Sequence, residues 1–86
     1  MGVRRLTIKV GETSVAMVDL ASGESIIGVA FSPDDDASRG AVEVTRVGRS
    51  DVEIRGLKVG SGTVGITIRN STTGRVRTIS IKVTVK

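Results

Sequence analysis

The apolar residues of this chain recur at every second position, and this alternation constrains the fold more than any other feature. In the closing segment "ISIKVTV", the apolar positions Ile79, Ile81, Val83 and Val85 alternate with Ser, Lys and Thr. Almost every segment repeats this pattern, and no stripe at spacings of three and four residues predicts an amphipathic helix. β-branched residues dominate the apolar set, which also favours strands. The pattern predicts an all-β chain.

Turn signals divide the alternating segments into seven predicted strands. Clusters of Gly, Ser, Asn, Asp and Pro separate them, and a strand about every 8–12 residues is typical of a sandwich or a barrel. We expect Ile27, Val29 and Phe31 to share the inner face of the third strand. We also expect a bulge near Thr78 to bring Val76 into phase with the last strand. The predicted strands cover residues 6–10, 14–20, 25–31, 41–47, 51–57, 63–69 and 75–85.

Composition restricts what can fill the core. Phe is present once and Trp, Tyr, His and Cys are absent, so aliphatic side chains must supply the packing and no disulfide can contribute. The length of 86 residues fits one domain, spanning residues 1–86. The predicted core consists of Val29, Phe31, Val42, Val44, Ile54, Ile66, Ile68, Ile81 and Val83.

The stretch "GLKVGSGTVGITI" at residues 56–68 has the glycine content of a phosphate-binding loop. A Walker-type loop needs wider glycine spacing, a Gly-Lys-Ser/Thr ending and a following helix, because backbone amides must wrap the phosphate at the helix start. Here no lysine follows Gly62, and the next residues alternate as a strand. We therefore interpret the stretch as a connection whose glycines take positive φ or let backbone pass close.

The residue types that carry most enzyme chemistry are missing. Without His or Cys, the common general base, metal ligand and thiol nucleophile are absent. One Phe in a core strand gives no aromatic platform for a sugar or for nucleic-acid bases. Asp34, Asp35 and Asp36 are consecutive, so they cannot all converge on one cation, and we interpret them as a solvated loop rather than a calcium site. We predict no catalysis, no small-molecule substrate, no cofactor and no metal.

Several segments resemble the bacterial Ig-like domains of group 2. "LTIKVGETSVAMV" is similar to the opening strand, turn and second strand of that family, and "GLKVGSGTVGITI" followed by "ISIKVTVK" is similar to its closing pattern. Phe31, in "VAFSPDD", lies where the family usually has a tryptophan. The resemblance spans essentially the whole chain. It implies a seven-stranded Ig-like β-sandwich that serves adhesion or assembly, as on bacterial surfaces and in phage structural proteins.

When the charged residues are placed on such a sandwich, the formal net charge of +4 lies at one end. If consecutive strands alternate in direction, the turns after the second, fourth and sixth strands lie at one end of the sandwich, together with the N-terminus. That end collects the predicted partner-binding residues, all of them arginines, which suit carboxylate or phosphate pairing. They are Arg4, Arg5, Arg46, Arg49, Arg69, Arg75 and Arg77. The alternative interpretation is a solvated charged rim that only maintains solubility.

These features together predict a non-enzymatic interaction module with a protein partner. No run of residues reaches the length of a membrane span, and no secretory signal is present. If Met1 is the native start, the chain fits a small phage virion protein, a capsid decoration or tail accessory protein, assembled in the host cytoplasm on a capsid or tail lattice. The first alternative is an adhesion module from a bacterial surface protein. The second is a small basic nucleic-acid-binding protein, which the lack of aromatic residues disfavours.

Overall fold

A computed structural model describes residues 4–86 of the chain and confirms the all-β prediction. Seven strands are joined by turns, with one 3-10 turn between the third and the fourth. In chain order, the elements are β1 (Arg4–Ile8), β2 (Thr13–Met17), β3 (Glu24–Pro33), η1 (Asp36–Ser38), β4 (Val42–Val47), β5 (Asp51–Gly56), β6 (Gly60–Asn70) and β7 (Val76–Val85).

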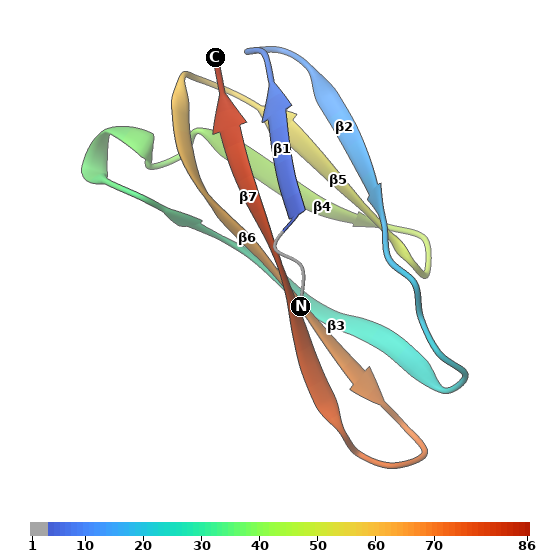
Figure 1. Cartoon of the computed structure of the whole chain (residues 1–86). Coiled ribbons are helices and arrows are strands. Elements are labelled where there is room, and N and C mark those ends of the chain that lie inside the picture. The colour runs from blue at the N-terminus through green and yellow to red at the C-terminus, as the bar shows by residue number, and fades with distance from the viewer. Residues whose placement is uncertain (1–3) are drawn as a thin grey trace.

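The strands form two sheets that pack face to face (Figure 1). The four-stranded sheet has the order β1-β7-β6-β3, and the three-stranded sheet has the order β2-β5-β4. β1 runs parallel to β7, with Leu6 opposite Val83, whereas the other pairings are antiparallel. The first and last strands therefore lie side by side although they are far apart in sequence.

The core lies between the sheets and is almost entirely aliphatic. Ile54, Ile66, Ile68, Ile81, Val42 and Val83 of the predicted core are buried, whereas Val29, Phe31 and Val44 are only partly buried and pack against the cluster. Sequence reasoning omitted several buried residues. These are Ile8, Val18, Ile26, Ala41, Val52, Val64 and Val85.

The prediction for Ile27 was wrong because the bulge lies in β3 and not in β7. The β3–β6 register shifts between Ile26 and Gly28, so Ile26 points into the core and Ile27 is 52% exposed. The β6–β7 register is continuous from Gly60 opposite Val85 to Arg69 opposite Val76, with no shift at Thr78. Val76 is therefore an exposed outer-face residue, as its phase in the sequence indicates.

The first two strands end two and three residues earlier than predicted. β1 stops at Ile8 because Lys9 and Glu12 close a turn, and Val10 is 49% exposed. β2 stops at Met17, although the next residue, Val18, is still buried.

The glycine-rich stretch is mostly strand. Gly60, Gly62 and Gly65 lie in β6, and Gly56 closes β5, so only residues 57–59 form a connection. None of these glycines has positive φ. Close approach explains three of them: an added Cβ would lie 2.9 Å from Lys9 O at Gly56, 2.9 Å from Ala41 Cβ at Gly60, and 2.6 Å from the Phe31 ring at Gly62. The stretch therefore packs against neighbouring backbone and side chains.

The turns are distributed between the two ends of the molecule (Figure 1). The β2–β3, β4–β5 and β6–β7 connections face one way, and the β1–β2, β3–β4 and β5–β6 connections face the other, beside the C-terminus. We call the first the hairpin end, because the β6–β7 hairpin extends farthest there. No helix within residues 4–86 is long and apolar enough to cross a bilayer.

Candidate docking end

A polar recess marks the hairpin end. The lower parts of β3, β6 and β7 extend past the three-stranded sheet (Figure 1). By strand phase, the inner side of the larger sheet carries the polar residues Glu24 and Arg77 in this part. Glu24 is in phase with the buried Ile26 of β3, and Arg77 is in phase with Ile79 and Ile81 of β7. The residues that line the recess are Glu24, Asn70, Thr73, Arg75, Val76 and Arg77.

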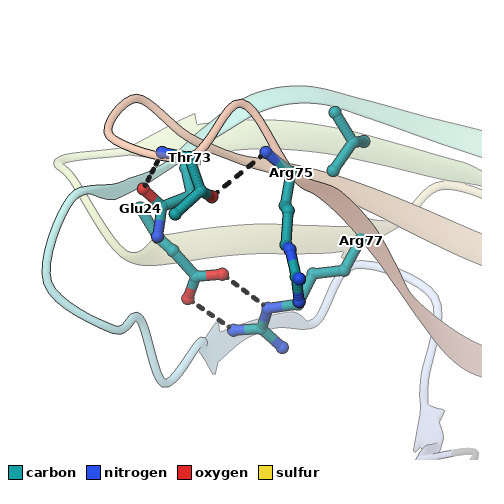
Figure 2. Close-up of a pocket in the computed structure, with 6 residues that line it drawn as sticks. Glu24, Thr73, Arg75 and Arg77 are labelled. Carbon is teal, nitrogen blue, oxygen red and sulfur yellow. Dashed lines mark hydrogen bonds and ion pairs between the residues drawn. The ribbon is translucent and has the colours of Figure 1, made fainter.

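An ion pair between Glu24 and Arg77 organises this recess (Figure 2). Arg77 Nε lies 2.9 Å from Glu24 Oε2, and Arg77 Nη2 lies 3.0 Å from Glu24 Oε1. Arg77 Nη2 also donates to the carbonyl of Asp19 at 2.8 Å, and the amide of Ala21 donates to Glu24 Oε1 at 2.7 Å. The pair therefore fastens the β2–β3 connection to two strands of the larger sheet.

The electrostatics of the recess follow from these contacts. The hydrogen bond from Arg77, and then that from the Ala21 amide, lower the pKa of Glu24 from 4.5 to about 2. The same pairing raises the pKa of Arg77. Glu24 therefore stays ionised at all ordinary pH values, and its charge is offset within the molecule.

The β6–β7 loop is fixed by its own side chains. Asn70 Oδ1 accepts hydrogen bonds from the amides of Thr72 at 2.9 Å and Thr73 at 3.2 Å, and Thr73 Oγ1 accepts one from the amide of Arg75 at 3.2 Å. The amide of Ser71 donates to the carbonyl of Gly23 at 2.9 Å, so the loop also contacts the β2–β3 connection. The backbone amide and carbonyl of Arg75 are therefore both hydrogen-bonded within this loop.

Two other predicted docking arginines close the open edges between the sheets. Arg4 of β1 donates from Nη1 to the carbonyl of Met17 in β2 at 3.0 Å. Arg46 of β4 donates from Nη1 to the carbonyl of Ile26 in β3 at 2.6 Å. Each contact joins an edge strand of one sheet to an edge strand of the other. Each of these two guanidinium groups bridges the two sheets at one edge.

The seven predicted arginines thus do not form one surface. Arg4, Arg46 and Arg77 make internal contacts. Arg5 and Arg69 point outward from the four-stranded sheet, since they alternate with the inward residues Leu6 and Ile68. Arg49, in the β4–β5 turn, and Arg75, in the β6–β7 loop, lie at the hairpin end, and neither guanidinium has an ion-pair partner within residues 4–86.

Sequence reasoning missed the polar partners of this end. Asn70, Thr73 and the Glu24 carboxylate shape the recess, yet none of them was a candidate. The signal was present for Glu24, because this charged residue lies in phase with the core residue Ile26.

The acidic run at the opposite end has three separate roles. Asp34 pairs with Lys82 at 3.1 Å and accepts a hydrogen bond from Ser61 Oγ at 2.9 Å, and these two contacts, that of Lys82 first, lower the pKa of Asp34. Asp35 caps η1 by accepting from the amide of Ser38 at 2.9 Å, and Asp36 lies 3.4 Å from Arg39 Nε. No group of three or more acidic side chains is arranged around a metal position in the part of the chain that the structure describes.

Comparisons with known proteins add a likeness to a solved structure. No protein-family model and no curated protein matches this chain. Among solved structures, the chain is similar to the cysteine protease inhibitor EhICP2 of Entamoeba histolytica, with 12% sequence identity and a TM-score of 0.44 over 98% of this chain and 95% of that one.

Proposed function

We propose that this chain is an Ig-like β-sandwich that works by protein–protein contact and not by catalysis. The strand order supports the Ig-like assignment: β2, β5 and β4 face β3, β6 and β7, as strands B, E and D face C, F and G in Ig domains. β1 joins β7 on the second sheet instead of β2 on the first. The resemblance to group 2 bacterial Ig-like domains agrees with this order.

One observation carries the docking proposal. Loop–loop and ion-pair contacts hold the hairpin end, and the guanidinium groups of Arg49 and Arg75 have no ion-pair partner among the described residues. A loop already ordered in the free state loses little conformational entropy on binding. Arginine forks suit a partner's carboxylates. We therefore assign this end to an acidic protein surface.

The setting that fits this module is a particle or a surface array. A small virion protein docked on a capsid or tail lattice is our first proposal, and an adhesion module of a bacterial surface protein is the alternative. Nucleic-acid binding is the third, and it differs by a steep salt dependence, because each neutralised phosphate releases a counterion.

The test is an NMR titration of the isotope-labelled chain with a poly-glutamate peptide and, separately, with duplex DNA. We expect the peptide to shift the amides of residues 48–50 and 70–77, and an Arg49→Ser/Arg75→Ser variant to lose most of this binding. Arg39→Ser, an exposed change at the opposite end, is the matched control. Peptide shifts centred on Asp34–Arg39, or undiminished binding by the double variant, would refute this docking end. Tighter binding of DNA with a steep salt slope would favour the nucleic-acid alternative.

A further inference from the structure

The two outer sheet faces carry opposite charge. On the four-stranded sheet, Arg5, Arg69 and Lys82 point outward, and Asp34 pairs with Lys82, so three cations and one carboxylate leave a net +2. On the three-stranded sheet, the outward charges are three carboxylates and one cation, which leave a net −2. These are Glu43, Asp51, Glu53 and Arg55.

The two faces also differ in how far their side chains protrude. On the three-stranded sheet, Met17 is 72% exposed and Val15 is 54% exposed, and they lie in register with Asp51 and Glu53. Val47 lies in register with Asp51 from the opposite side. This face therefore presents raised apolar side chains beside a carboxylate row.

The four-stranded face has a low centre. Ala30, Gly65 and Ser80 lie opposite one another across β3, β6 and β7, so small side chains cross the middle of the sheet. Among residues 4–86, no atom lies within 4 Å of a Cβ built on Gly65, and its φ is not positive, so neither packing against these residues nor backbone geometry requires glycine there. A glycine inside a strand weakens it and often marks a bulge, a tight bend, or a site where a ligand or another backbone approaches closely. The strand register is continuous on both sides of Gly65, so no bulge explains it.

We propose that the outer face of the four-stranded sheet binds the outer face of the three-stranded sheet of a second copy of this chain. The charge complementarity carries the proposal, since net +2 meets net −2, and the raised Met17 and Val15 meet the low row at Gly65. A face-to-itself dimer would place like charges opposite each other. The contact is therefore heterologous, and its repetition builds an open chain of copies.

The smaller face limits the strength of this contact. Three strands about 4.8 Å apart and five or six residues long give a flat area on the order of 300 Å². A standard interface buries about 800 Å² per partner. The association is therefore weak, and the fraction of associated copies becomes large only at high local concentration, as on a particle surface. It does not depend on the docking end proposed above.

Sedimentation of the purified chain at several concentrations tests the proposal. At low ionic strength, we expect the average mass to rise with concentration above the monomer value of 9.0 kDa, and to return to it at ~0.5 M salt. Glu53→Arg alone and Arg5→Glu/Arg69→Glu alone should each lower the association constant about tenfold or more. The two variants mixed should recover the parent's association constant but form only heterodimers, because each retains one native face.

Two controls separate this contact from other causes. Arg49→Ser/Arg75→Ser should self-associate like the parent, which distinguishes sheet stacking from docking at the hairpin end. Gly65→Leu fills the low row and should weaken association without unfolding the chain, as checked by circular dichroism. A parent that stays monomeric to millimolar concentration at low salt would overturn the proposal. So would charge variants that associate like the parent, or a mixture that shows no recovery.

Discussion

Replacing Gly62 with alanine tests how the glycine-rich stretch is packed. Gly62 is buried in β6, and a Cβ there would lie 2.6 Å from Cε1 and Cζ of Phe31 and closer still to the carbonyl oxygen of Ser32. The Phe31 ring can move, because it is only partly buried on an edge strand. The Ser32 carbonyl belongs to the β3–β6 pairing and cannot move without disturbing the register.

Two opposing effects set the change in the free energy of unfolding caused by Gly62→Ala. Overpacking a filled site costs about 1–3 kcal/mol. The lower entropy of the unfolded chain returns about 0.4–1 kcal/mol when glycine becomes alanine. Gly62→Ala should therefore destabilise the fold by ~1–2 kcal/mol, which in a domain of this size lowers Tm by roughly 5–15 °C.

Gly65→Ala is the matched control in the same strand. Its Cβ would meet no atom of the described residues within 4 Å, so we expect no loss of stability and a gain of up to ~1 kcal/mol. Urea and thermal unfolding followed by far-UV circular dichroism measure both variants, since the chain has no Trp or Tyr for fluorescence. Equal stability of the two variants would show that the close approach at Gly62 does not exist.

Three further measurements address the core and the ion pairs. Phe31→Ala should cost less than the ~3–5 kcal/mol typical of a fully buried Phe, because the ring is partly exposed; a larger loss in urea unfolding would place it deeper. Folding lowers the pKa of Glu24 from 4.5 to about 2, so its ion pair stabilises the fold fully above pH 4.5. The stability advantage of the parent over Glu24→Gln should therefore shrink as the pH falls from 4.5 towards 2. A difference in stability that does not change with pH would contradict the pairing. Arg46→Ala should cost ~1 kcal/mol through its lost hydrogen bond, whereas Arg69→Ala should stay within ~0.5 kcal/mol; equal losses would remove the inter-sheet role of Arg46.

The sequence predicted the strands well because alternation is a local signal. The seven strands and the aliphatic core follow from apolar period and turn chemistry, which depend on neighbouring residues. The bulge was misplaced because both "SIIGVAF" and "RVRTISIKV" contain one phase conflict each, and alternation alone does not say which is real. The β3–β6 register resolves the conflict by burying Ile26 and leaving Ile27 outside.

The glycine roles could not be read from the sequence for a different reason. Gly56, Gly60 and Gly62 are explained by Lys9, Ala41 and Phe31, which are distant in sequence and become neighbours only in the folded chain. The turn glycines with positive φ are in other segments, such as Gly23 and Gly74. A glycine that is required by close packing in the folded chain cannot be distinguished in the sequence from a glycine that is required by turn geometry.

The arginines show that strand phase, and not position along the strand, separates internal contacts from free surface charge. Arg4 is in phase with Leu6 and Ile8, and Arg46 is in phase with Val42 and Val44. These guanidinium groups start on the inner side of a sheet, and a carbonyl at the edge of the other sheet is the acceptor they reach. Arg5 and Arg69 have the opposite phase and face outward. Sorting each arginine by the phase of its apolar neighbours therefore divides the charges into those that hold the two sheets together and those that a partner can contact.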